Sequence, residues 1–321
     1  MIRILGIVGP TGGGKSALAL ALAERLSGEI ISCDSMQVYR RMDIGTAKPN
    51  EEEQRRVRHH LIDVAEPQET FSCADYVPLA EAAIKECAAA GKLPIVCGGT
   101  GLYLDALLRK NDFAPDTVNE EVRRELWMTF EREGAETLYR ELERIDPESA
   151  AATHPNNVKR VIRALEIYRV CGVTKTELDR RSREGGMRYD ACVLGLRYAE
   201  RETLYRRIDR RVDTMMEAGL EAETRALMAE GVFERNQTAA QAIGYKELLP
   251  YCRGEEALET AVENLKTATR RYAKRQMTWF GAKEYVQWME IGQSADEKTF
   301  EEIVNNAERL FQKNEKYDII K

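Results

Sequence analysis

The stretch Gly9-Pro10-Thr11-Gly12-Gly13-Gly14-Lys15-Ser16 decides the fold. It matches the pattern G-x-x-x-x-G-K-[ST], which is typical of a phosphate-binding P-loop. The apolar run 4–8 precedes it and the Ala/Leu-rich run 17–23 follows it, so it joins a buried strand to a helix. Backbone N–H groups and the positive end of that helix then surround one anion. We expect a di- or triphosphate there, with Lys15 on its terminal phosphates and the Ser16 hydroxyl on Mg²⁺.

Composition places the chain among ordinary globular proteins. Its 321 residues suggest one large or two modest domains, and 43% hydrophobic residues suffice for a core. No apolar run approaches the ~20 residues that span a bilayer, and no signal-peptide pattern is present. The seven cysteines are scattered and lack C-x-x-C spacing. Together these features predict a reduced, cytoplasmic protein without a membrane partner and without a disulfide or zinc framework.

The hydrophobic pattern alternates strands and helices over residues 1–110 and then changes. Expected strands are 4–8, 29–33, 61–64, 93–97 and 191–196, and expected helices are 17–23, 74–90, 102–109, 119–134, 135–146, 156–171 and 200–230, with two further helical stretches beyond. Strands alternating with helices indicate a parallel sheet. We therefore predict an α/β fold, with a P-loop NTPase-like parallel-sheet core (1–112 and 191–321) and a mainly helical insertion domain (113–190).

Two polar segments follow predicted strands. Asp34 comes directly after the second strand, where it could hold Mg²⁺ or act as a general base, or merely cap the next helical turn. Gly98-Gly99-Thr100-Gly101 follows another strand, and it is either a ligand-binding turn or an ordinary turn with a threonine cap. Because parallel strands end at a common edge, we expect the P-loop, Asp34 and Thr100 to lie close together.

The window 264–283 concentrates positive charge. It carries six Lys and Arg residues and no acidic residue, within a chain whose net charge is −6. On a helix these cations form one face, which suits a polyanion such as a nucleic acid. An ordinary solvated face is the alternative, but the window offers no acidic i,i+4 partners. Leu265, Tyr272 and Trp279 recur every seven residues and are expected to anchor this helix to the core.

Smaller basic clusters leave more than one interpretation open. Arg206, Arg207, Arg210 and Arg211 are interleaved with Asp209 and Asp213, which favours ordinary salt bridges there. Arg225 either clamps a phosphate or pairs with Glu221 one helical turn earlier.

The string Gln241-Ala242-Ile243-Gly244-Tyr245-Lys246 combines a glycine, an aromatic residue and a cation. Tyr245 either stacks on an unpaired base or packs in the core, and the string alone favours the core.

The ordered set of motifs is similar to the tRNA dimethylallyltransferase (IPP transferase) family. The segments that carry the resemblance are Gly9–Ser16, Ile31–Tyr39, Met42–Pro49, His59–Asp63, Gly98–Tyr103, Gln241–Tyr245 and Lys274–Trp279, which span about residues 3–288. The resemblance implies transfer of a dimethylallyl group from dimethylallyl diphosphate to the N6 amine of adenine 37, just 3′ of the anticodon, with release of diphosphate. It also implies Mg²⁺, the tRNA anticodon stem-loop as partner, a monomeric state, and a P-loop used for a diphosphate.

The resemblance also assigns roles to individual residues. Asp34 matches the general base and Thr100 a residue near the reacting groups. Arg225 matches a diphosphate clamp beside the P-loop, and Ser16 the metal ligand. Residues that match tRNA-contacting positions are Asp34, Ser35, Met36, Gln37, Thr100, Arg123, Lys159, Arg160, Val161, Ile162, Arg163, Gln241, Ala242, Ile243, Gly244, Tyr245, Lys246, Lys274, Arg275, Gln276, Met277, Thr278, Trp279, Phe280 and Gly281.

Two other classes of P-loop protein are the alternatives. A small-molecule or nucleotide kinase has no need of the basic helix at 264–283. A regulatory ATPase or GTPase needs a Walker B strand and a water-positioning residue, and Leu61-Ile62-Asp63 is a poor version of that strand.

Overall fold

The computed structural model describes residues 1–109, 119–292 and 297–317. The chain divides into two compact units, one formed by residues 1–108 with 189–321 and the other by residues 109–188. The first contains the sheet and the P-loop, and the second is helical.

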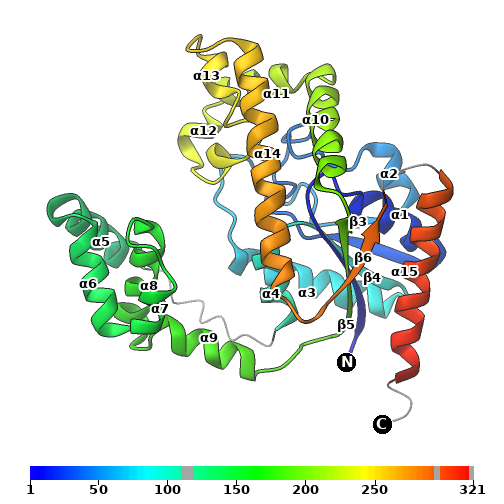
Figure 1. Cartoon of the computed structure of the whole chain (residues 1–321), viewed down its shortest axis with the longest axis horizontal. Helices are drawn as coiled ribbons and strands as arrows, with labels where there is room; N and C mark the ends of the chain where they lie inside the picture. The colour runs from blue at the N-terminus through cyan, green and yellow to red at the C-terminus, as the bar shows by residue number, and fades with distance from the viewer. Residues whose placement is uncertain (110–118, 293–296, 318–321) are drawn as a thin grey trace. The chain divides into compact units, whose positions relative to one another are not determined.

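The first unit is built on a parallel sheet, as the sequence predicts (Figure 1). Within the described residues its strands run in the order β3-β2-β4-β1-β5-β6, all parallel. Their bounds are β1 (Arg3–Val8), β2 (Gly28–Ser32), β3 (His59–His60), β4 (Leu93–Cys97), β5 (Asp190–Tyr198) and β6 (Val286–Ile291). The prediction of a strand at 61–64 is wrong, because Leu61 and Asp63 take φ angles of 61° and 57°, which no strand accommodates. The sequence pattern did not reveal β6.

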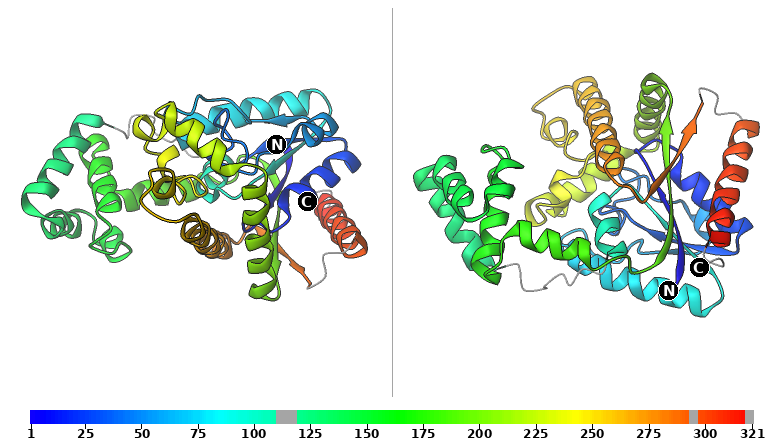
Figure 2. Two further views of the ribbon diagram at one scale, coloured as in Figure 1. Left: turned by 90° about the horizontal axis from the view of Figure 1, so that it is seen from above. Right: turned by 60° about the horizontal axis from the view of Figure 1, so that its bottom comes forward.

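Helices cover both faces of this sheet, which explains why its strands are nearly continuous apolar runs. On one face, α1 (Lys15–Arg25) and α15 (Glu297–Tyr317) pack against the side chains of Leu5, Ile95 and Leu194. On the other face lies α3 (Cys73–Ala89), which contacts β2 and β4 (Figure 2). The carboxyl ends of β1, β2 and β4 are left for the P-loop, Asp34 and the turn at 98–100.

The first unit contains further helices. They are α2 (Glu51–Arg56), α4 (Gly101–Leu108), α10 (Arg201–Glu217), α11 (Leu220–Ala229), α12 (Val232–Arg235), η2 (Ala239–Gln241), α13 (Leu249–Cys252) and α14 (Leu258–Gly281). The prediction of one long helix over 200–230 is wrong. Gly219 adopts a left-handed φ of 99°, which ends α10 and starts α11. Helices α10 and α14 lie side by side (Figure 1).

The second unit is a small helical bundle. Its helices are α5 (Glu120–Glu133), α6 (Ala135–Ile145), α7 (Pro147–Ala151), α8 (Val158–Cys171) and α9 (Lys175–Glu184). Leu126, Leu138 and Leu165 lie at its core. Glu166 is fully buried there and is neutralised by Arg123 at 3.2 Å and Arg163 at 2.7 Å.

None of the helices in the described ranges combines the length and apolar character needed to cross a bilayer.

Candidate active site

The P-loop has a backbone that glycine makes possible. Gly9, Gly12 and Gly14 have φ angles of 139°, 72° and 89°, a region that residues with a Cβ rarely occupy. Gly14 is the N-cap of α1 and provides no side-chain cap, so the first N–H groups of the helix point to the site without a side-chain partner. This geometry suits an anion.

Lys15 lies beneath the loop, and its Nζ donates a hydrogen bond to the carbonyl oxygen of Pro10 at 2.8 Å. The pKa of Lys15 is lowered to about 8, chiefly by burial; the nearby Arg211 charge acts in the same direction, while Cys97 and Asp34 oppose the shift. A bound anion would replace the lost hydration, so the site favours a negatively charged ligand.

Thr100 contacts the backbone of Ser35, the residue that follows Asp34. Asp34 Oδ1 accepts hydrogen bonds from the N–H groups of Met36 at 2.9 Å and Gln37 at 3.4 Å, which is the capping role that the sequence left open. No described residue donates to the other carboxylate oxygen, so capping leaves that oxygen available. Thr100 Oγ1 accepts from the Ser35 N–H at 3.0 Å, and this contact holds the turn at 98–101 against the residues after β2.

Two adjoining pockets open at this edge of the sheet. The inner one is lined by Lys15, Ser16, Asp34, Gln37 and Gly99, among others. The outer one encloses about 240 Å³. Residues lining the outer pocket include Ser35, Met36, Gln241, Ala242, Ile243, Gly244, Tyr272 and Arg275. Thr11, Asp34 and Arg211 line both, so one continuous site runs from the P-loop past Asp34 to α14.

Gln276 ties α14 to both glycine turns. Its Oε1 accepts from the Thr11 N–H at 2.8 Å, and its Nε2 donates to the Gly99 carbonyl at 3.0 Å. A Cβ on Gly99 would lie 2.1 Å from that Nε2, so the contact requires glycine. The side chain is 5% exposed. Gln276 therefore positions the two turns relative to each other, and its expected contact with tRNA stays a prediction.

Arg211, on α10, is an arginine that the structure places at both pockets of the site. It lines both pockets, and burial lowers its pKa while the Asp34 charge opposes the shift. The neighbouring Arg207 donates to the Gly12 carbonyl at 3.2 Å. The salt bridges expected within 206–213 do not form, because Asp209 and Asp213 pair with Arg270 and Lys266 of α14 instead.

Arg225 lies elsewhere on the surface and lines neither pocket. It pairs with Glu221 at 2.9 Å and stacks over the ring of Tyr251. Of the two interpretations from the sequence, the structure supports pairing with Glu221 and not a phosphate clamp.

The basic face of α14 is smaller than its sequence suggests. Lys266, Arg270 and Lys283 pair with Asp213, Asp209 and Asp105 at 2.6, 2.8 and 2.6 Å. The window holds no acidic i,i+4 partner for these cations, but the fold provides acids from neighbouring helices, and Glu263, seven residues before Arg270 on α14, also pairs with it. The remaining cations, which form no ion pair with any described residue, are Arg271, Lys274 and Arg275, and all three are exposed.

The other expected tRNA contacts divide into exposed and buried side chains. Lys159, Arg160, Gln241, Lys246, Lys274, Thr278 and Trp279 are exposed, Gly281 ends α14 at the surface, and Met277 is partly buried. The side chains that are buried are those of Val161, Ile162, Ala242, Tyr245 and Phe280, and their expected contacts with tRNA stay predictions. The core interpretation of Tyr245 is confirmed, since it is fully buried and its hydroxyl donates to Glu223 at 2.7 Å. Trp279 is 39% exposed, but its indole packs against Gly101 of α4, so it anchors α14 at the edge of the core.

A P-loop beside a carboxylate, a buried arginine and an exposed cationic helix defines a phosphate-handling transferase of the P-loop class. Comparison with known proteins identifies the family within this class. The IPP transferase family model matches residues 37–284. A tRNA dimethylallyltransferase of Caldanaerobacter subterraneus is 44% identical over 309 residues, covering 95% of this chain and 96% of the relative.

Solved structures agree. The tRNA isopentenylpyrophosphate transferase of Bacillus halodurans superposes with a TM-score of 0.73 at 42% identity, covering 99% of each chain. A eukaryotic dimethylallyltransferase acting on tRNA superposes with a TM-score of 0.78 at 31% sequence identity. The match covers 90% of this chain and 74% of the other.

The chain therefore belongs to the IPP transferase family. It is a prenyltransferase that transfers a dimethylallyl group to adenine 37 of tRNA. The kinase and regulatory NTPase alternatives are wrong.

The lowered pKa of Lys15 predicts how anion binding depends on pH. The protonated ammonium binds the anion, so the affinity of the free protein for inorganic diphosphate should fall as the pH rises through about 8. Titration calorimetry from pH 7 to 9.5 measures this. The Lys15→Arg variant keeps its charge and corrects for titration of the ligand itself. A ratio of the two affinities that stays constant with pH would contradict the account.

Proposed function

We propose that the donor is dimethylallyl diphosphate, that the P-loop holds its diphosphate with Mg²⁺, and that Asp34 is the general base. The observation that supports this is the continuous site in which Lys15 and Asp34 line the same inner pocket. In it a departing diphosphate and an acceptor amine can meet. The enzyme acts on the anticodon stem-loop as a monomer in the cytoplasm.

The leaving group determines the task of the P-loop. As the bond between the allylic C1 and the diphosphate oxygen breaks, negative charge grows on the diphosphate. Lys15, Arg211 and the amides of residues 12–16 provide positive charge and N–H donors where that charge develops, and such preorganised groups stabilise a transition state strongly. The P-loop thus serves a departing diphosphate rather than a transferred γ-phosphate.

The oxygen donors at the inner pocket fit Mg²⁺. The Ser16 hydroxyl and the Asp34 carboxylate both line it, and hard oxygen ligands suit this ion. Ser16 would hold Mg²⁺, which would contribute further positive charge against the diphosphate.

Asp34 acts at the adenine. The N6 nitrogen forms a bond to C1 while the C1–oxygen bond breaks, and the N6 proton passes to the Asp34 carboxylate oxygen that takes no part in capping. Thr100, through its bond to the Ser35 N–H, holds the Asp34–Gln37 segment in place. The adenine must leave its stack to reach this depth, as in other enzymes that act on bases.

Exposed cations bind the RNA. On the first unit Arg271, Lys274 and Arg275 are available, and on the second Lys159 and Arg160. Each contact with a phosphate adds affinity that falls with salt. Gln241 to Gly244 line the outer pocket and contact the nucleotides next to the flipped adenine.

The Asp34→Asn variant tests the assignment of the base. Its transfer of labelled dimethylallyl groups to an anticodon stem-loop, with Mg²⁺ present, should fall by about 10²-fold or more, since proton transfer contributes on that order. Stem-loop affinity should change by less than about threefold. Nucleoside analysis of the product and a binding titration provide the two readouts.

The control is Asp190→Asn, at the start of β5 and therefore at the opposite end of the sheet. It should retain full turnover. If Asp34→Asn also retains it, Asp34 is not the base.

The two candidate arginines can be separated by substitution. Arg211→Lys should raise the KM for dimethylallyl diphosphate by about tenfold or more, because a bidentate donor fork is lost at the pocket. Arg225→Lys should change it by less than about twofold. Steady-state kinetics at saturating stem-loop RNA measures both. The reverse order would restore Arg225 as the clamp.

A further inference from the structure

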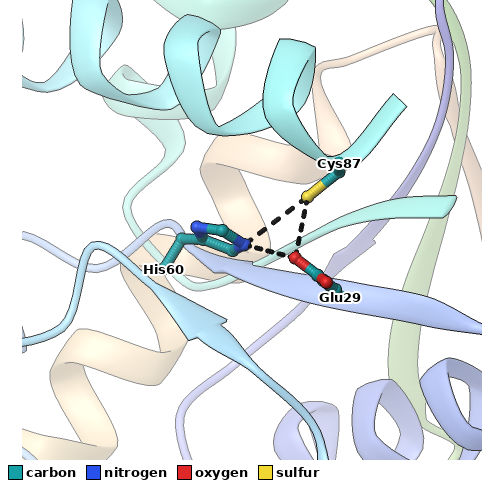
Figure 3. A group of neighbouring side chains, drawn as sticks. All are labelled: Glu29, His60 and Cys87. Atoms are coloured by element: carbon teal, nitrogen blue, oxygen red, sulfur yellow. Dashed lines mark hydrogen bonds and ion pairs between the residues drawn. The ribbon is translucent and has the colours of Figure 1, made fainter. Parts of the chain in front are cut away.

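Three side chains outside the active site converge from three different elements (Figure 3). Glu29 comes from β2, His60 from β3 and Cys87 from α3. Glu29 Oε2 lies 2.7 Å from His60 Nε2 and 3.4 Å from Cys87 Sγ, and the latter two atoms are 3.5 Å apart. The sequence alone predicts no zinc framework, because no ligand-like spacing connects these residues.

The donor set is chemically specific. One thiolate, one imidazole and one carboxylate form a borderline-soft set that suits Zn²⁺. The donors of a tetrahedral zinc lie about 3.3–3.7 Å apart, given its usual bond lengths. The distances from Cys87 Sγ to Glu29 Oε2 and to His60 Nε2 already fall in this range. The shorter distance between Glu29 Oε2 and His60 Nε2 would widen to it when an ion replaces their hydrogen bond.

We propose that Glu29, His60 and Cys87 form a binding site for a thiophilic divalent cation, with Zn²⁺ as the fitting ion and water as its fourth ligand. Cys87 is fully buried, and the side chains of His60 and Glu29 are 8% and 15% exposed. The open position therefore faces solvent on the Glu29 side. Binding releases the Cys87 thiol proton, now hydrogen-bonded to Glu29, to the solvent.

The surrounding charges are compatible with a dication. The nearby positive group is Arg58, whose guanidinium is 4.0 Å from Glu29 Oε2. It is already paired with Glu86 at 2.7 Å. The Glu29 carboxylate and the Cys87 thiolate then balance the two charges of the ion.

Such an ion would secure the edge of the sheet. Strand β3 has only two residues and pairs with β2 alone. Its other residue, His59, lines the inner pocket of the active site. A cation that connects β2, β3 and α3 would thus stabilise one wall of that pocket without taking part in the reaction.

Titration of the metal-free protein with Co²⁺ tests the proposal. Co²⁺ occupies zinc sites, and a thiolate ligand produces a charge-transfer band in the near ultraviolet. The wild-type protein should bind one equivalent with this band. The Cys87→Ser variant should lack it, and His60→Gln should bind at least tenfold more weakly.

The matched control is Cys97→Ser, because Cys97 is a buried thiol that lines the phosphate pocket. It should keep the band. Absence of the band in the wild-type protein, or its persistence in Cys87→Ser, would overturn the proposal. Transfer activity measured with Mg²⁺ is a separate readout, so failure of this site and failure of the proposed reaction are distinguishable.

Discussion

The contact on which the site depends is the bridge from Gln276 to two glycine turns. One turn is the P-loop, which we propose holds the leaving group, and the other, at 98–101, supports Asp34 through Thr100 and Ser35. This buried amide, together with the hydrogen bond from the Gly98 N–H to the Ile7 carbonyl, therefore fixes the separation between the two turns. Because misplacement by about 1 Å can cost about 10²-fold in rate, such a rigid link has catalytic value without touching the substrate.

Ion pairs between α10 and α14 determine which cations remain for ligands. Asp209 and Asp213 each neutralise a cation of α14, which joins the two helices. Arg211 of α10 forms no ion pair with a described residue and lines both pockets, and the unpaired cations of α14 are exposed. Within its described part, an acidic chain thus keeps unpaired positive charge at the site and on α14, where anionic ligands are attracted.

The sequence predicts the parts of this molecule that local chemistry determines. The P-loop, the parallel sheet and the positions of Asp34 and Thr100 at strand ends follow from short motifs and periodicity. What it misses depends on tertiary contacts. From the sequence, Arg211 belongs to a run expected to form salt bridges with Asp209 and Asp213. In the structure these two aspartates pair with cations of α14 instead, which leaves Arg211 unpaired among the described residues. Tyr245 and Phe280 match RNA-contacting positions but are buried, and Glu29, His60 and Cys87 meet only because β2, β3 and α3 are neighbours.

Substitution of Gln276 by methionine tests the central claim most directly. The side chain keeps its length but loses both hydrogen bonds. The account predicts that kcat falls by about tenfold or more while KM for both substrates stays within about threefold, and that the ratio of dimethylallyl diphosphate hydrolysis to transfer rises. Gln312→Met, on the exposed surface of α15, should change none of these. An unchanged kcat, or a rise confined to the KM for RNA, would contradict the account and make Gln276 a simple RNA contact.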